Sequence, residues 1–200
     1  MRVSKEKAAE NRQNMLTAAA RLFREQGVSA TGVDAITKDV SLTHGAVYSQ
    51  FGSKEAIAAE AIRLAFRGSK HLWQRLAERK GAKKAFPAIV AQYLSPEHRD
   101  APGQGCVAAA LGADVARQPP SVRDAFTEEF KDALTFLTGV MPGDDPACRY
   151  EEAIAAFASM VGALTLARAV SDRTLSDLIL HTTAKRLLDP PKLERAARRS

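Results

Sequence analysis

The side chains that could carry out chemistry in this sequence are thinly spread, with one exception between residues 31 and 54. Elsewhere there is no glycine-rich phosphate loop, serine nucleophile elbow, HExxH pair or cluster with zinc-ligand spacing. The four histidines are scattered, and none has an acid at a useful spacing: His44, His71, His98 and His181. Cys106 and Cys148 lie far apart, without metal-ligand spacing, and predict no disulfide framework. We therefore expect no catalysis, no bound metal and no cofactor.

The exception reads TGVDAITKDVSLTHGAVYSQFGSK and predicts two short helices joined by a tight turn. Thr31 is expected to cap the first helix, with Asp34 reaching back as in a capping box. Thr43 is expected to cap the second helix, and Ser53 a third helix that opens with Lys54. Helices of fewer than ten residues are not stable alone in water, so this pair must pack against something longer.

Two short helices joined by a tight turn are one way in which proteins present a helix to the DNA major groove. Many all-helical proteins also contain such a pair without binding DNA. The candidate DNA-contacting residues are small or polar: Thr31, Thr43, His44, Gly45, Tyr48, Ser49 and Lys54. The Tyr48 phenol and the Lys54 ammonium suit phosphate oxygens, which fix register without reading sequence. The alternative for Tyr48 is a partly buried core residue.

The run from Gly45 to Ile57, GAVYSQFGSKEAI, resembles the DNA-binding signature of the TetR (tetracycline-repressor) family. That signature has a tyrosine, an aromatic residue three positions later and a lysine three beyond that. An acidic residue and an aliphatic one follow. Thr31, Ile36 and the segment 12–27 also match. The specific resemblance covers about the first quarter of the chain.

Four residues depart from the family pattern. Thr37 stands where alanine is usual, Gln50 stands where histidine is common, and Val40-Ser41 replaces an Ala-Gly pair before the turn. Because glycine is missing at the turn, we expect its backbone conformation to differ.

Helical periodicity along the chain predicts an all-α protein. The expected parts are a three-helix DNA-binding domain with a helix-turn-helix over 1–52, a helical effector-binding and dimerisation domain over 53–190, and a basic flexible tail over 191–200. The expected helices outside the pair cover 6–26, 53–79, 83–94, 106–117, 121–137, 147–170 and 174–188. Gly68-Ser69 is expected to bend or interrupt the long helix, and residues 95–105 are expected to form a loop. Before the first helix, Arg2, Lys5 and Lys7 form either a solvated tail or an arm that touches DNA.

The composition suits a soluble DNA-binding protein without proving one. The chain has 200 residues, a formal net charge of +6 and 46% hydrophobic residues, and its isoelectric point is about 9.5. A basic chain suits a polyanionic partner, although many basic proteins bind none. We find no apolar run long enough to span a bilayer and no signal peptide, so we expect a cytoplasmic protein without a membrane partner.

The last two expected helices are apolar over most of their surface, and α-helices of this kind are buried on more than one side. They could complete a monomer's core or meet their copies in a homodimer, and their small residues favour the dimer. The TetR resemblance implies the same arrangement. The residues expected at the interface are Ile154, Phe157, Val161, Leu164, Leu175, Leu178, Ile179 and Thr182.

The TetR resemblance also implies a small-molecule effector pocket within the C-terminal helices. Its candidate lining is mostly aromatic, which favours an apolar or aromatic ligand: Phe66, Trp73, Phe86, Tyr93, Cys106, Phe126, Phe130, Phe157 and Met160. Ordinary core packing is the alternative for each of them. For Cys106 the alternatives are an inert small hydrophobe and a thiol that reacts with oxidants or electrophiles.

The sequence therefore predicts a homodimeric, sequence-specific transcriptional regulator. The expected activity is that of a repressor released from a near-palindromic operator by a small ligand, with two reading helices roughly 34 Å apart. Two alternatives stay open: a DNA-binding protein without an effector ligand, and a helical ligand carrier unrelated to DNA.

Overall fold

The computed structural model describes residues 4–189, and helices account for most of that part of the chain. Over these residues it contains no strand, so the all-α prediction is confirmed. In chain order the elements are α1 (Lys5–Gln26), α2 (Val33–Asp39), α3 (His44–Phe51), α4 (Lys54–Lys80), α5 (Ala82–Tyr93), α6 (Pro96–Asp100), the 3₁₀ helix η1 (Pro102–Gln104), α7 (Val107–Val115), α8 (Pro120–Val140), α9 (Pro146–Ala169) and α10 (Arg173–Leu188).

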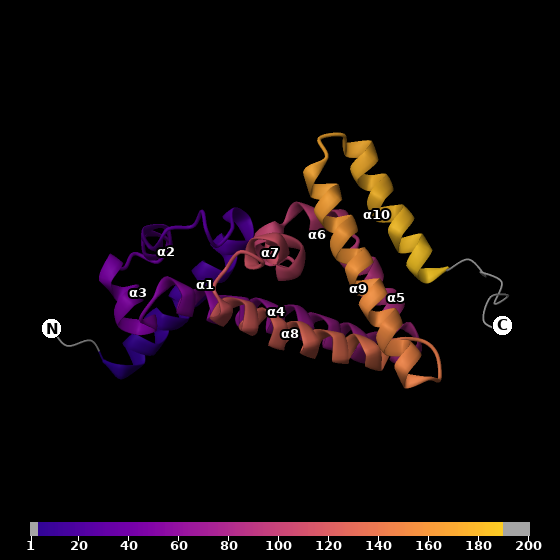
Figure 1. The fold of residues 1–200 in the computed structure, drawn as a ribbon, viewed down its shortest axis with the longest axis horizontal. Helices are drawn as coiled ribbons and strands as arrows, with labels where there is room; N and C mark the ends of the chain where they lie inside the picture. Colours follow the sequence, from indigo (N-terminus) through magenta and orange to yellow (C-terminus); the bar gives the residue numbers. More distant parts are fainter. Residues whose placement is uncertain (1–3, 190–200) are drawn as a thin grey trace.

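The helices are arranged along a spine formed by α4 and α8, which lie side by side (Figure 1). The three N-terminal helices gather at one end of α4. Helices α9 and α10 pack against each other at the opposite end, and α6 and α7 lie between the two ends. Helix α4 therefore reaches from the N-terminal helices to the C-terminal ones.

The core of the N-terminal end explains why two very short helices are stable. Phe23 of α1, Ile36 of α2, Val47 of α3 and Ile57 of α4 are all inaccessible to solvent and belong to one hydrophobic cluster. Because α2 and α3 each bury their apolar residues on α1 and α4, tertiary packing replaces the stability that their length cannot supply.

The turn between α2 and α3 is a Schellman motif. The Leu42 amide donates to the Thr37 carbonyl at 2.8 Å, and the Ser41 amide donates to the Lys38 carbonyl at 3.2 Å. This motif requires a left-handed residue after the helix, and Ser41 takes that conformation with φ of 56°. The missing glycine was expected to change the backbone of this turn, but Ser41 takes the left-handed conformation that glycine adopts more readily.

Several expected helix details are wrong. Gly32, and not Thr31, precedes α2, and no side chain caps that helix. Helix α4 continues without a break through Gly68 and Ser69, where the Ser69 hydroxyl donates to the Ala65 carbonyl at 3.2 Å. Lys5 and Lys7 do not precede α1 but open it. Arg2 and the expected tail at 191–200 lie outside the described residues.

The segment expected to be a loop at 95–105 contains α6 and η1. His98 organises it: its Nδ1 bonds the Tyr93 carbonyl at 2.7 Å, and the Cys106 amide donates to its Nε2 at 2.9 Å. A carbonyl only accepts and an amide only donates, so His98 is the neutral tautomer with the proton on Nδ1. Burial lowers the pKa of His98, against the raising effect of the hydrogen bond to Tyr93.

Helix α9 corrects the expectation that no segment could span a bilayer. By length and composition alone this helix of 24 residues could do so, and 39% of its most apolar window is buried inside the protein. It packs against α7, α8 and α10. A core helix of a soluble protein has the same composition, so the finding by itself points to no membrane.

Replacing Ser41 with glycine is expected to stabilise the protein by about 0.5–1 kcal/mol, because relief of the left-handed strain exceeds the greater freedom of glycine in the unfolded chain. The measurement is the urea midpoint at constant m-value. Ser49→Gly, at an exposed position within α3, should instead lower stability by about 0.5 kcal/mol. A loss of stability in Ser41→Gly would contradict the strain at this turn.

The His98 bridge predicts a pH dependence of stability. Its lowered pKa means that, as pH falls below about 6.5, the unfolded chain takes up a proton that the folded chain resists. The contribution of neutral His98 to the free energy of unfolding is complete above that pH. It is lost as pH falls through the pKa of His98 in the folded state, which is the lower of the two. His98→Gln should lose about 1 kcal/mol at pH 7.5 and show a shallower loss between pH 7.5 and 5.5. His71→Gln, at an exposed position of α4, should keep the wild-type slope in the same thermal unfolding series.

Candidate nucleic-acid interface and the cavity behind it

Helix α3 has one buried face and one exposed polar face. Val47 and Phe51 pack into the core. Four residues of the helix and the residue before it are exposed: Thr43, His44, Gly45, Tyr48 and Ser49. All five were predicted to contact DNA, and they form a continuous surface of small and polar side chains.

Tyr48 and Gly45 are solvent-exposed parts of this surface. The Tyr48 side chain is 47% exposed, which removes the interpretation that it is a core residue, and its ring lies 5.3 Å from that of His44. No atom lies within 4 Å of the position that a Cβ at Gly45 would occupy. The surface around Gly45 is therefore free to be approached closely by a partner.

The His44 ring is paired across the turn with Asp34. Its Nδ1 contacts a carboxylate oxygen of Asp34, so Asp34 does not close the expected capping box on α2. Both side chains are exposed, and a DNA phosphate approaching His44 would meet this carboxylate. The pair therefore fixes the orientation of the imidazole at the start of α3.

Lys54 lies at the start of α4, after the Ser53 cap whose hydroxyl accepts from the Ala56 amide at 3.1 Å. Its ammonium donates to the Ser29 carbonyl at 3.3 Å, in the turn between α1 and α2. An ammonium held by a single long hydrogen bond at an exposed turn keeps donors for a phosphate. Lys54 is thus held beside the surface of α3.

Thr31 is not part of that surface, and the prediction that it contacts DNA is wrong for this conformation. The residue is completely buried. Its hydroxyl donates to the Gly27 carbonyl at 2.7 Å and lies 3.4 Å from the Leu22 carbonyl. Thr31 instead closes the end of α1 and sets the path of the chain into α2.

A carboxylate from α7 holds the turn between α1 and α2. Asp114 accepts from the Val28 amide at 2.6 Å, the Ser29 amide at 3.3 Å and the Ser29 hydroxyl at 3.0 Å. Gln118 adds a hydrogen bond to the same hydroxyl at 2.9 Å. Burial raises the pKa of Asp114, but the hydrogen bonds from Ser29, Val28 and Gln118 outweigh it and leave the pKa below its usual value. Asp114 was not predicted, because nothing in the sequence relates residue 114 to residue 28.

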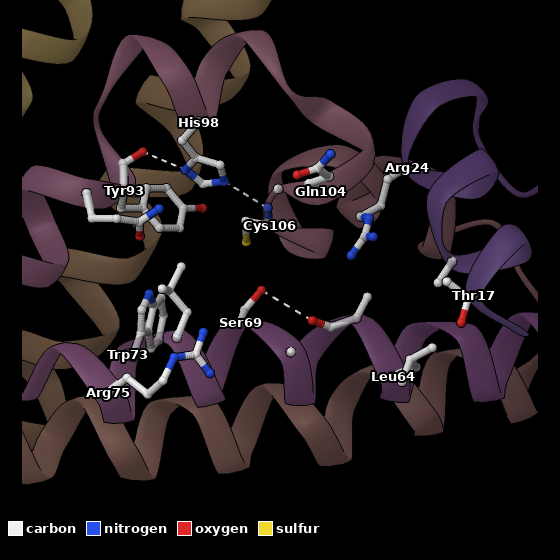
Figure 2. A pocket seen from close by; sticks show the side chains of 16 residues that line it. Thr17, Arg24, Leu64, Ser69, Trp73, Arg75, Tyr93, His98, Gln104 and Cys106 are labelled. Carbon is white, nitrogen blue, oxygen red and sulfur yellow. Dashed lines mark hydrogen bonds between the residues drawn. The ribbon is translucent and has the colours of Figure 1, made fainter. Parts of the chain in front are cut away.

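Behind the N-terminal helices lies a cavity of about 470 Å³ between α1, α4, α5 and the α6–η1 segment (Figure 2). Of the nine predicted lining residues, three are found here: Trp73, Tyr93 and Cys106. All three are almost fully buried. The structure therefore brings these three residues to the wall of one cavity.

The other predicted lining residues lie elsewhere. Four phenylalanines of α4, α8 and α9 contact one another in a row: Phe66 meets Phe126 edge to face at 5.2 Å between ring centroids, and stacked pairs follow at 5.9 Å for Phe126–Phe130 and 5.2 Å for Phe130–Phe157. Met160 is completely buried. Phe86 faces a separate hollow near the ends of α8 and α10. Phe66, Phe157 and Met160 belong to the core, and Phe126 and Phe130 pack against it.

The cavity has polar walls that the sequence analysis missed, including Arg24, Arg75, Gln92, His98 and Gln104. Arg24 was expected only as part of the first helix of the DNA-binding domain. Helical periodicity does not show that η1 packs against this helix, and so it does not place Arg24 at a cavity. The glycine-rich sequence of 102–105 was the only signal. At Gly103 a Cβ would lie 2.2 Å from a Glu25 carboxylate oxygen, so a larger residue where η1 meets α1 would require the Glu25 side chain to move.

The outer faces of α9 and α10 remain uncovered. Ile154, Leu175, Leu178 and Thr182, predicted to lie at a dimer interface, are exposed, and Val161 and Ile179 are partly exposed. Leu166, which was not predicted, is 57% exposed on the same helix pair. Phe157 and Leu164 are enclosed in the chain's own core, so their side chains cannot contact a partner in this conformation and that part of the prediction is wrong.

Three comparisons with known proteins agree with this geometry. An HTH-type transcriptional regulator of Mycobacterium tuberculosis strain H37Rv, itself uncharacterized, is 27% identical over 189 residues, covering 88% of this chain and 93% of the relative. The HTH-type transcriptional regulator AcrR of Shigella flexneri is 42% identical over 59 residues, 30% of this chain and 27% of AcrR. The crystal structure of a TetR-family transcriptional regulator from Cytophaga hutchinsonii has the same fold, with a TM-score of 0.76, 20% identity and coverage of 94% of this chain and 97% of that one.

Residues 15–61 match the model of the bacterial regulatory proteins of the tetR family. The matched segment contains α2, α3 and the start of α4, with the exposed face described above. Members of this family are transcriptional regulators and not enzymes, which agrees with the expectation of no catalysis. Together these findings support a DNA-binding transcriptional regulator of the tetR family.

Proposed function

We propose that this regulator is a homodimeric repressor that binds a near-palindromic operator and leaves it when a small organic ligand occupies the cavity. The observation that carries the proposal is the junction around Asp114. It ties the turn before α2 to α7, which follows the cavity residue Cys106 directly in the chain. A movement of the cavity wall at Cys106 can therefore reach the turn before α2 through α7 and Asp114.

The reading unit is the segment 1–52, and α3 is its recognition helix. Thr43, His44, Gly45 and Ser49 face the major groove, while Tyr48 and Lys54 contact phosphates. The exposed apolar residues of α9 and α10 support a dimer in which these helices meet their copies. Two-fold symmetry would place two α3 helices in successive major grooves, roughly 34 Å apart, and the operator would mirror that symmetry.

Ligand control acts through rigid elements. Helix α4 lines the cavity with Leu64 and Trp73 and carries Lys54 at its other end. Helix α1 lines it with Thr17 and Arg24 and leads into the turn held by Asp114. A ligand that binds one spacing of α1 and α4 better than another would shift the dimer away from the spacing that fits DNA.

Tyr48→Phe and Lys54→Ala are expected to weaken binding to all DNA sequences, by roughly several-fold and about tenfold respectively, because each removes a phosphate contact. The test is fluorescence anisotropy on DNA from directly upstream of the protein's own gene, beside scrambled DNA, over a salt series. The slope of log K against log salt should become shallower by about one for Lys54→Ala. Lys80→Ala, exposed at the far end of α4, should bind as wild type. Unchanged affinity in both test variants would refute the assigned surface.

Asp114→Asn is expected to destabilise the protein by roughly 1–3 kcal/mol, since one amide oxygen cannot accept all four hydrogen bonds that the carboxylate accepts. Amide hydrogen exchange at Val28 and Ser29 should accelerate, and operator affinity should fall. The lowered pKa of Asp114 stabilises the wild type above about pH 4, and this contribution is lost as pH falls through the folded pKa. Asp114→Asn should not show this loss of stability at low pH. Asp124→Asn, exposed on α8, is the matched control, and equal exchange rates in both variants would rule out the junction.

A further inference from the structure

Arg24 lines the cavity with a positive charge and forms no ion pair with any residue of the described part of the chain. Its Nε is buried and has no hydrogen-bond partner among the described residues. Burial lowers its pKa, against raising contributions from Cys106 and Glu25, and an arginine remains a cation at neutral pH. Glu25 is the adjacent residue, and its carboxylate bonds Arg21 at 2.9 Å. A half-buried guanidinium without a hydrogen-bond acceptor or a counter-charge destabilises the fold unless a ligand supplies them.

The opposite wall offers a second unsatisfied group. The Tyr93 hydroxyl is buried and makes no hydrogen bond of normal geometry with the described residues. Burial, followed by the nearby Cys106 thiol, raises the pKa of Tyr93 well above its usual value, so the hydroxyl keeps its proton. Figure 2 shows the Arg24 side chain and the Tyr93 ring on opposite sides of the space below Cys106. The cavity therefore presents donors from two sides.

The charges around the cavity have one sign. None of the described residues that line it is acidic, and Arg75 is a second arginine of the wall. Arg168 lies behind His98, where its guanidinium donates to the carbonyls of His98 and Arg99 at 2.8 and 3.0 Å. His98 itself is held neutral by its two backbone partners. Trp73, buried on α4, supplies an apolar wall between these polar groups.

We propose that the ligand of this cavity is an organic anion, a carboxylate, sulfonate or similar acid attached to an aromatic or aliphatic body. Its acidic group binds Arg24 and accepts from Tyr93, and its body packs against Trp73. The volume of about 470 Å³ lies within the range of small-molecule sites. This assignment rests on the proposed ligand-controlled function, and it narrows the expected apolar or aromatic ligand to one that carries a negative charge.

A ligand bound to Arg24 would also contact the DNA-reading segment directly, through α1. Arg24 lies in the last turn of α1, just before Gly27 and the Val28–Ser29 turn bound by Asp114. An anion held between Arg24 and Tyr93 connects α1 to α5, two helices that line opposite sides of the cavity. Occupancy would therefore fix the end of α1 relative to the C-terminal helices.

The test uses two probes that differ in one charged group: 8-anilinonaphthalene-1-sulfonate and N-phenyl-1-naphthylamine, which lacks the sulfonate. Both are titrated into the full chain, and binding is followed by energy transfer from Trp73, the single tryptophan. The quantity compared is the ratio of the two dissociation constants. Arg24→Met should reduce the preference for the sulfonate by about tenfold or more, the value of a hydrogen-bonded charge. Arg79→Met, exposed in the last turn of α4, should leave the ratio unchanged.

Tyr93→Phe provides a second variant that changes no charge. It should weaken sulfonate binding several-fold and leave the neutral probe unaffected. A ratio that stays constant in Arg24→Met and Tyr93→Phe, a drop of equal size in Arg79→Met, or no sulfonate binding detected through Trp73 would each overturn the proposal. If Arg24→Met does not fold, as judged by circular dichroism, the Tyr93→Phe result decides.

Operator binding in the presence of each probe separates this proposal from the function on which it rests. Selective sulfonate binding with no effect on the anisotropy of the upstream DNA complex would leave the anion site intact and refute release by a ligand. Release by the neutral probe but not by the sulfonate would keep the ligand-controlled regulator and overturn the anionic assignment. Release by the sulfonate that disappears in Arg24→Met would support both.

Discussion

Helices of seven and eight residues cannot be stable alone in water, and this constraint shapes the whole N-terminal end of the molecule. Helices α2 and α3 each bury their few apolar residues in a common core with α1 and α4. Val47 and Phe51 fill one face of α3, and only the remaining face is available to a partner. The polar surface at Tyr48 and Ser49 thus follows from the packing: the residues that do not stabilise the helix are the ones left to face outward.

The same dependence connects the reading helices to the rest of the chain. The turn between α1 and α2 has backbone amides that no helix satisfies, and Asp114 of α7 accepts hydrogen bonds from two of them. Helix α1 also touches η1, where Gly103 lies against the side chains of Glu25 and Arg21. The N-terminal helices are therefore held by specific polar and steric contacts with the segments around the cavity, and a change in those segments acts on them directly.

Periodicity succeeded for the helices and failed for the cavity, and the reason is physical. A 3.6-residue pattern identifies the side of a helix that faces inward, which is why α1, α4, α9 and α10 were placed within a residue or two of their ends. It does not distinguish a side chain that packs against a neighbour from one that faces an empty space. Phe126, Phe130 and Phe157 satisfy the pattern as well as Trp73 does, yet they stack on one another. Arg24 breaks the apolar pattern, so nothing suggested that it faces inward.

The sequence by itself determined the helical content, the exposed face of α3 and the resemblance to the TetR family. These features depend on neighbours within a few positions, through capping, periodicity and turn geometry. Only the tertiary structure decided that Thr31 is buried, that Phe157 and Leu164 belong to the monomer's core, and that Arg24 meets Tyr93 and Trp73 around one cavity. Those placements depend on contacts between residues tens of positions apart, and such contacts leave no periodic trace in a single chain.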